Sequence, residues 1–255
     1  MQRIENISLS YKKRIELGKS SEVLSFFVIS QYPHLATRDG LPWNPSTQTN
    51  TFSQILNSYS VPVLRLLSFF KQIPEFNQLN IDDKVTLIKY NLRTVIGINS
   101  VLSYNTETAQ IIETNSDVPC STQVFQLVYG YKICFRLQKI YHSFLRIGNY
   151  DSKIIQLVPI VLILTKGFST TDSREPILHD TMGVYRAQSY YTELLWKYME
   201  ATHGSEVAIR LFSELIIQAV SWQTIQEDMR NNILRTLSPK DIDELLPIMK
   251  SVWHL

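Results

Sequence analysis

The chain has 255 residues, of which 44% are apolar and 19% are charged, so it can bury a sizeable core. Its net charge of +2, from 25 basic and 23 acidic residues, is too small to indicate a nucleic-acid-binding surface. The 8 glycines form neither of the usual phosphate-binding patterns, which weighs against dinucleotide-binding and P-loop enzymes.

Cysteine content and hydropathy narrow the class further. The two cysteines, Cys120 and Cys134, are too few for a disulfide scaffold in a chain of this length, so we expect free thiols in a reducing compartment. No uncharged stretch is long enough to indicate a membrane span, and the first residues lack the pattern of a signal peptide. We expect a single domain over residues 1–255.

Helical periodicity dominates from the first residues onward. Residues 2–18 are predicted to form a helix, and residues 19–50 a largely irregular connection, because three prolines and a glycine interrupt it. The next helix is predicted over residues 51–73. Pro62 should kink it, because proline lacks an amide hydrogen and crowds the preceding turn, and Pro74 should end it.

The following segment is predicted to form the central helix. Asn80 can cap a helix over residues 81–102, with Asp83 as the acidic partner of a capping box. This helix is apolar almost all round, so we expect it to be buried in the middle of the fold. Residues 103–120 mix aromatic and β-branched residues with turn formers, which favours a small hairpin with strands near Tyr104 and Ile111.

The remaining sequence is also predicted to be helical. The expected helices cover residues 121–147, 151–166, 174–201 and 205–235. Gly167 is expected to be a helix C-cap, and Ser205 to open the long penultimate helix. Ser238 and Asp241 match a capping box, and Pro247 suits the first turn of a short last helix. Periodicity alone therefore predicts a helical fold around a single core.

The segment from Lys71 to Lys89 carries the most informative pattern in the chain. An amphipathic helix ends at a proline, a short turn brings one aromatic and one aliphatic residue, and two acidic residues open a second apolar helix. This run resembles the signature of nuclear receptor ligand-binding domains. The positions that fit the signature are Phe76, Leu79, Asp83, Leu87, Ile88 and Lys89. Phe70 and Lys84 depart from it, since the family usually has alanine and glutamine there.

The resemblance implies both a fold and a function. The fold would be all-α, a three-layer helical sandwich with one small β-hairpin, and the protein would be a transcription regulator in the nucleus, with shuttling to the cytoplasm left open. The resemblance covers residues 50–255, whereas residues 1–49, a first helix and a variable connection, add little to it. Two cysteines cannot build the zinc modules with which nuclear receptors bind DNA, so this chain should make no direct nucleic-acid contact.

The end of the chain resembles the activation helix of these receptors, most of all that of the ecdysone receptor and liver X receptor group. Ile248, Met249, Val252 and Trp253 fall on one helical face, which could dock over a ligand cavity and help to form a groove for a partner's amphipathic helix. The alternative is a last helix that packs permanently on the core. The residues expected around the coregulator groove are Lys71, Lys84, Lys89, Ile248, Met249, Ser251, Val252 and Trp253.

One position in this groove departs from the family. Receptors clamp the partner helix between a lysine, matched here by Lys71, and a glutamate in the last helix, where this chain has Ser251. Serine offers only a neutral acceptor, and charge-assisted hydrogen bonds are roughly twice as strong as neutral ones. We therefore expect weakened or absent ligand-dependent recruitment of Leu-x-x-Leu-Leu coactivator helices.

The resemblance also points to residues that would line a ligand cavity. They are Leu56, Tyr59, Val63, Leu66, Ile96, Asn99, Ser100 and Ser103. Many receptors hold an acidic ligand with an arginine at the position of Ser103 or Asn99, and both are neutral here. A neutral lipid, sterol or isoprenoid is therefore expected as ligand. The alternative is a ligandless interaction module whose cavity is filled by its own bulky side chains.

Other functions and partners receive less support. A homo- or heterodimer through residues 205–235 is expected from the resemblance, with Trp222 either an interface anchor or a buried core residue. The chain has neither a G-x-S-x-G elbow nor an H-E-x-x-H motif, so we expect no enzyme activity. His142 and His179 lack ligand-spaced partners, and no metal or cofactor is expected. Asp82 and Asp83 are adjacent, point apart on a helix and are expected to serve as caps.

Overall fold

The computed structural model describes residues 53, 56–57, 59–101, 103–107, 110–111, 126, 129–168 and 175–255. The helix and the connection predicted within residues 1–49, together with most of residues 121–128, lie outside this described part.

The first fully described helix is α4 (Ser60–Phe70), followed by the short helix α5 (Pro74–Gln78). The predicted kink at Pro62 is wrong, because α4 begins at Ser60 and Pro62 falls in its first turn. A proline is tolerated there, since the first amides of a helix have no intrahelical acceptor. Pro74 occupies the first position of α5, and α5 buries Phe76.

Helix α6 (Ile81–Val101) agrees closely with the predicted central helix. Asn80 caps it, since the side-chain oxygen of Asn80 accepts a hydrogen bond of 2.9 Å from the backbone N–H of Asp82. The predicted capping role of Asp83 is wrong. Its buried carboxylate instead accepts hydrogen bonds from the backbone N–H groups of His179, at 2.7 Å, and Asp180, at 2.9 Å. Asp83 thereby ties the start of α6 to the segment that leads into α10.

The predicted hairpin is present, with shorter strands than expected. Strands β1 (Tyr104–Asn105) and β2 (Gln110–Ile111) pair antiparallel, with Tyr104 opposite Ile111. Helix α8 (Tyr131–Tyr150) then starts after Gly130, and α9 (Ser152–Ile163) follows directly. The predicted C-cap role of Gly167 is wrong, because α9 ends at Ile163. Gly167 instead lies in a turn with a φ of 77°, and its N–H donates to the Glu175 carboxylate.

The last helices are α10 (Thr181–His203), α11 (Ser205–Thr236), α12 (Pro239–Glu244) and α13 (Pro247–Trp253). Helix α10 begins later than predicted because Asp180 caps it, accepting a hydrogen bond from the N–H of Gly183. Ser205 opens α11 as predicted. The predicted capping box of α12 is confirmed, with Ser238 and Asp241 each bonding the other's backbone N–H.

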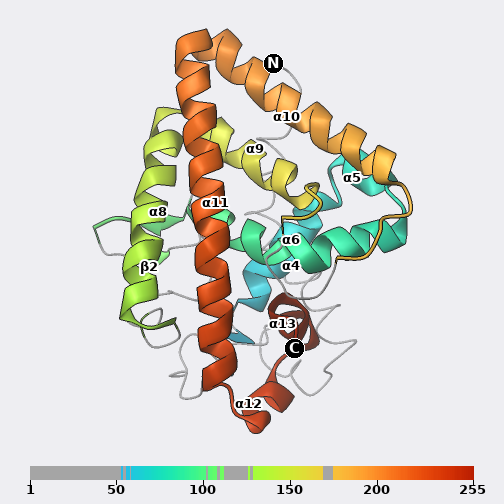
Figure 1. Cartoon of the computed structure of the whole chain (residues 1–255), viewed down its shortest axis with the longest axis vertical. Helices are drawn as coiled ribbons and strands as arrows, with labels where there is room; N and C mark the ends of the chain where they lie inside the picture. The colour runs from blue at the N-terminus through green and yellow to red at the C-terminus, as the bar shows by residue number, and fades with distance from the viewer. Residues whose placement is uncertain are drawn as a thin grey trace.

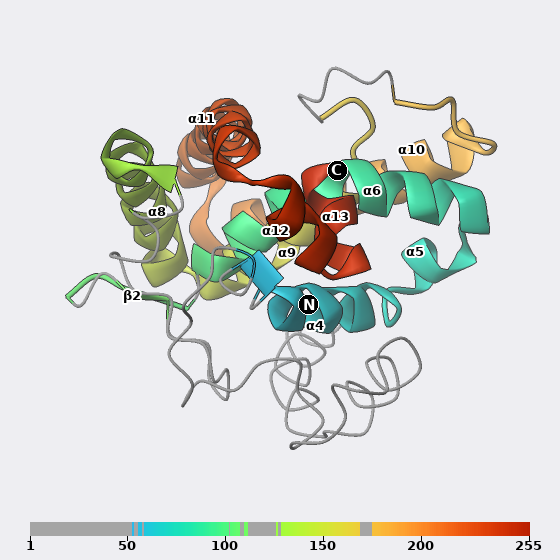
Figure 2. The same cartoon turned by 90° about the horizontal axis from the view of Figure 1, so that it is seen from below.

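The helices form three layers around one core (Figures 1 and 2). Helix α4 forms one outer layer, α6 and α9 pack together in the middle, and α8, α10 and α11 form the other outer layer. The middle helices bury the largest share of their residues, including the polar Asn91, whose side-chain amide donates to the carbonyl groups of Ile163 and Thr165. The expected all-α, three-layer sandwich with one small hairpin is confirmed.

Candidate ligand cavity and coregulator surface

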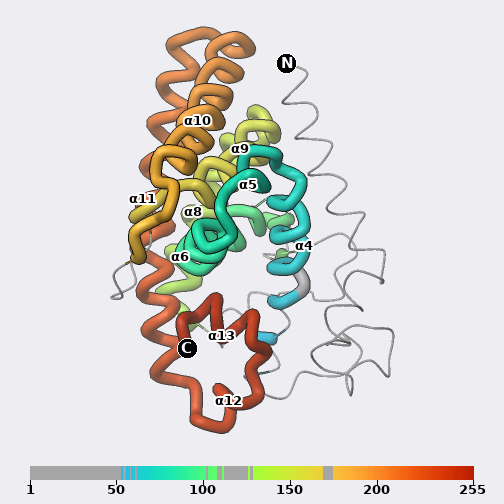
Figure 3. Tube along the Cα trace, turned by 90° about the vertical axis from the view of Figure 1, so that its right-hand side faces the viewer, coloured from blue at the N-terminus to red at the C-terminus, as the bar shows by residue number. Residues whose placement is uncertain are grey.

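Helices α6, α11 and α13 meet around a small cavity. Figure 3 shows α13 below α6, between α11 and α4. The cavity has a volume of about 50 Å³. Its walls are formed by Tyr59, Arg93, Ile96, Gly97, Ser100, Tyr129, Tyr141, Trp222, Gln226, Met229, Met249, Val252 and Trp253.

Trp222 fills much of the space between α6 and α11. Its side chain is 2% exposed and its ring stacks on that of Tyr141, with ring centroids 5.8 Å apart. A Cβ atom added at Gly97 would lie only 1.7 Å from Cζ2 of Trp222, so the indole uses the room that the glycine leaves. Of the two roles considered for Trp222, the structure supports that of a buried core residue.

The size of the cavity bears directly on the expected ligand. Pockets for drug-sized ligands have volumes of about 300–1,000 Å³. The cavity beside Trp222 is several-fold smaller, so a sterol or an isoprenoid does not fit in this conformation. The aromatic side chains that close it are Tyr129, Tyr141, Trp222 and Trp253, all of which are buried.

The cavity wall carries a positive charge on α6. The guanidinium carbon of Arg93 lies 5.9 Å from the centre of the Trp253 ring, so the cation faces an aromatic side chain of α13. Burial, with a further contribution from Arg230, lowers the pKa of Arg93 to about 10. The pKa of His254, directly after α13, is lowered to about 4 by burial, and also by Arg93, Arg230 and Lys89. Positive charge therefore accumulates where α6, α11 and α13 meet.

The residues predicted to line the ligand cavity divide into two groups. Tyr59, Ile96 and Ser100 lie in its wall. The remaining five do not: Leu56, Val63, Leu66 and Asn99 are fully buried in the core, and Ser103 is half-buried in the turn before β1. Contact of any of these eight residues with a ligand stays a prediction.

The residues predicted for the coregulator groove also differ in their exposure. Met249, Val252 and Trp253 face inward and are at most 5% exposed, whereas Ile248 is half-buried and Ser251 is exposed. Helix α13 therefore turns its apolar face to the cavity and its polar face to solvent.

The three lysines lie on α4 and α6. Lys71 is exposed directly after the last residue of α4. Lys84 donates a hydrogen bond to the backbone carbonyl of Asn77 in α5. Lys89 is exposed, and its ammonium group lies over the ring of Tyr90. The ring of Tyr90 lies 5.6 Å from that of His254, which brings this part of α6 next to the end of α13.

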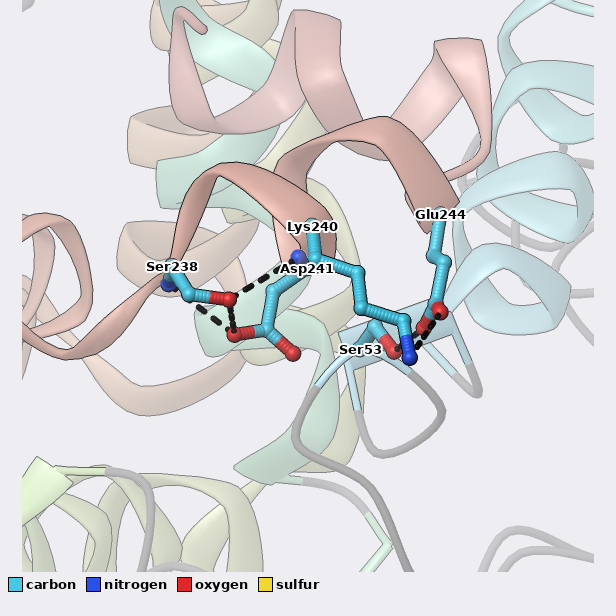
Figure 4. A network of polar contacts seen from close by, with 5 residues as sticks. All are labelled: Ser53, Ser238, Lys240, Asp241 and Glu244. Atoms are coloured by element: carbon cyan, nitrogen blue, oxygen red, sulfur yellow. Dashed lines mark hydrogen bonds and ion pairs between the residues drawn. The ribbon is translucent and has the colours of Figure 1, made fainter.

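A polar network holds the approach to α13 against residues that precede α4 (Figure 4). The carboxylate of Glu244, at the end of α12, accepts a hydrogen bond of 2.7 Å from Ser53. The same carboxylate forms an ion pair with Lys240, at a distance of 3.9 Å. The side chain of Asn57 donates to the backbone carbonyl of Glu244 and accepts from the N–H of Leu246. Asn57 thus satisfies both backbone groups at the α12–α13 junction.

Sequence reasoning missed Arg93, Ser53 and Asn57. An arginine in the middle of the buried central helix is a usable signal, because a charge in such a place needs a partner or a function. Ser53 and Asn57 gave no such signal, since their partners lie about 190 residues away along the chain.

The described part of the chain gives little support for a metal site, a reactive cysteine or a membrane span. Its residues contain no cluster of three or more histidine, cysteine or acidic side chains that could hold a metal ion. Cys134 is buried, and burial raises the pKa of its thiol to about 11, which makes the reactive thiolate scarce at neutral pH. None of the described helices combines the length and the apolar character needed to cross a bilayer.

Comparison with known proteins supports a relationship to nuclear receptors. No family profile matches the chain. Over 203 residues, or 79% of its length, the chain is 24% identical to the nuclear hormone receptor HR96 of Drosophila melanogaster. The match covers 27% of that receptor, so the chain spans about a quarter of the relative's length. The fold agrees with a nuclear receptor ligand-binding domain, and the chain is similar to a receptor of this class.

Proposed function

We propose that the chain is the ligand-binding domain of a nuclear-receptor-type transcription regulator that acts in the nucleus, with residues 1–255 as a single domain. The observation that carries this proposal is the position of α13. Its apolar face closes a cavity between α6 and α11, and α13 packs on α6, the helix that carries Lys89. This arrangement suits a helix that reports the state of the cavity to an outside partner.

The partner is a coregulator helix that docks between α4, α6 and α13. Val85 is 56% exposed on α6, between Lys84 and Lys89, and supplies an apolar contact for such a helix. Lys71 supplies a positive charge for the helix C-terminus. Ser251, exposed on α13, meets the other end without a negative charge.

A peptide-binding experiment tests this role. Fluorescence anisotropy of a labelled Leu-x-x-Leu-Leu peptide should give weak binding to the wild-type chain. Ser251→Glu should strengthen binding by about tenfold, because it adds a charge-assisted bond to the peptide's N-terminal amides. Lys71→Ala should remove that gain.

The matched control adds the same charge at a remote exposed site. Ala201 lies in the last turn of α10, which ends at the opposite end of the molecule from α13 (Figure 1). Ala201→Glu should leave peptide affinity unchanged. Equal affinity of the wild-type chain and Ser251→Glu would remove the support for a clamp at this position.

A second candidate, a ligandless interaction module of the same fold, is favoured by the way Trp222 fills the cavity. In that case α13 stays docked permanently and no small molecule changes peptide affinity. Peptide binding that responds to no added compound would support this candidate over a ligand sensor.

The proposal also includes association with another chain through α11. Ile209, Ile216, Ile217 and Val220 lie on one side of this helix and are each more than half exposed. Exposed apolar stripes of this kind mark protein interfaces. They support a homo- or heterodimer in which two long helices pack together.

A further inference from the structure

The cavity between α6, α11 and α13 is surrounded by hydrogen-bond donors that lack acceptors. The indole N–H groups of Trp222 and Trp253 are buried, as is the side-chain N–H₂ of Gln226, and none has a partner among the described residues. Gln226 uses its oxygen to accept a hydrogen bond of 2.7 Å from Thr94, which orients the amide nitrogen as the free end. In Arg93 both Nε and Nη1 are buried without an acceptor in the described part of the chain.

These groups share one property that decides what could complement them. All of them donate, so another donor or an apolar ligand would leave them unsatisfied, whereas an acceptor-only group satisfies several at once. Ionised carboxylates are such groups, and an arginine fork matches their geometry.

The charges around the cavity point the same way. Lys89, Arg93 and Arg230 form no ion pair within the described residues, although Glu227 is close enough to favour the charged form of Arg93. Asp228, the neighbouring acid, is paired with Arg136 on α8. A partly buried cation without a close counter-ion is costly, and a bound anion offsets that cost.

We propose that this cavity binds the carboxylate of a small organic acid, held by Arg93 and Gln226 with Trp253 of α13 as a further donor. The proposal deepens the function proposed above and rests on it in that α13 forms one wall of the site. The proposed ligand is an anion, whereas the sequence led us to expect a neutral ligand. The positive charge that would bind the anion belongs to Arg93 on α6 and not to the positions of Asn99 or Ser103.

The cavity volume selects the size of the acid. About 10–15 Å³ of such space holds one water molecule, so a volume of about 50 Å³ admits a carboxylate with a short carbon chain. Trp222 blocks the direction in which a longer chain would extend from α6 towards α11. We therefore expect a short-chain acid to bind with the indole in place, and a long-chain acid only if Trp222 moves.

The ligand would also stabilise α13. Because Trp253 belongs to α13 and Arg93 to α6, one carboxylate would link the two helices across the cavity. Binding should therefore slow hydrogen exchange at the amides of α13 more than at those of α10.

Calorimetry on the full chain tests the site with butyrate as the probe and 1-butanol as its uncharged match, at constant ionic strength. Butyrate should bind, and butanol should not. Arg93→Met should weaken butyrate binding by at least about tenfold. Arg210→Met, which removes an exposed arginine of α11 that lies outside the cavity wall, should leave the affinity unchanged.

Further variants guard against a loss of folding in Arg93→Met. Arg93→Lys keeps the charge and should retain part of the affinity, and Gln226→Leu should weaken binding with Arg93 intact. Octanoate that binds with the same dependence on Arg93 would support the carboxylate site and show that Trp222 moves. Equal behaviour of butyrate and butanol, or butyrate affinity that does not depend on Arg93, would overturn the proposal.

These outcomes are separate from those of the peptide experiment. Butyrate binding that depends on Arg93 in a chain with no affinity for coregulator peptides would leave the anion site standing and remove the coregulator role. Peptide binding that depends on Lys71, without any effect of butyrate, would do the reverse.

Discussion

Gly97 and Trp222 show how a single residue pair determines the volume of the cavity. The glycine lies within α6, where alanine would be the better helix former. Its missing Cβ leaves the room into which the indole of Trp222 reaches from α11. Because the indole also stacks on Tyr141 of α8, the pair fixes the contact of three helices.

Gly97→Ala should destabilise the chain by about 1–3 kcal/mol, the usual cost of overpacking a core. The gain in helix propensity is smaller than this cost, since the new Cβ would overlap the indole. The midpoint of urea unfolding, compared with that of the wild-type chain, measures the change.

A double-mutant cycle separates this clash from other effects of the substitution. Trp222→Phe alone should lower stability because it leaves a void, whereas in the Gly97→Ala background it should raise stability because it removes the overlapping ring. If Trp222→Phe has the same sign in both backgrounds, the two side chains do not compete for one space.

At the scale of elements, α13 is a short helix whose position depends on its two ends. Three of its side chains are buried over the cavity, but seven residues make too short a helix to be stable alone. Asn57 fixes the junction with α12 through two hydrogen bonds, and His254 ends α13 in a left-handed conformation with a φ of 53°. The junction therefore sets where α13 begins its contact with α6.

Asn57→Ala should loosen α13 without unfolding the core. Two hydrogen bonds contribute about 1–2 kcal/mol, so amide exchange in residues 247–253 should become roughly tenfold faster. Exchange in α6 should stay as in the wild-type chain. Hydrogen exchange read by mass spectrometry resolves both segments.

Asn231→Ala serves as the control, because Asn231 is an exposed asparagine of α11 that faces solvent. It should change exchange in α13 little. Unchanged exchange of residues 247–253 in Asn57→Ala would mean that burial of Trp253 and its neighbours holds α13 without the junction.

For the whole molecule, the long helix α11 combines a buried and an exposed apolar side. Its buried side packs on α6, α8 and α10, and Trp222, Ile225 and Met229 belong to it. Its opposite side carries the exposed stripe of isoleucines and Val220. The exposed stripe does not stabilise a monomer, because its side chains lie in water. We therefore propose that the stripe forms an interface with another chain.

Ile216→Glu should weaken self-association by at least about tenfold, because it places a charge in an apolar contact. Sedimentation velocity over a range of concentrations measures the effect. Ile177→Glu is the control, since Ile177 is 88% exposed and lies outside α11. A wild-type chain that stays monomeric at all concentrations would leave only a different partner for α11.

Local sequence signals predicted most of the elements, because they act over a few residues. The capping box of Ser238 and Asp241, the opening of α11 at Ser205 and the extent of α6 all follow from such signals. The errors at Pro62 and Gly167 are also local in kind. In both cases a helix boundary differs from the predicted one, which changed the role of the residue.

The nuclear receptor signature predicted the fold, but it did not predict the contacts of its acidic residue, Asp83. Asp83 was expected to cap its own helix, and it instead binds two backbone amides almost 100 residues further along the chain. No local pattern encodes such a contact, since it exists only when the segment before α10 lies beside the start of α6.

The amino-acid sequence by itself thus determined the helical class, the order of the elements and the resemblance to nuclear receptors, because periodicity and capping depend on near neighbours. Only the tertiary structure decided that Trp222 fills the cavity through Gly97, that Asn57 holds the start of α13, and that Arg93 lines the cavity without an ion pair to any of the described residues. Each of these is a contact between residues far apart in the chain. Such contacts depend on how the helices pack, and packing is settled by the shapes of all the side chains together.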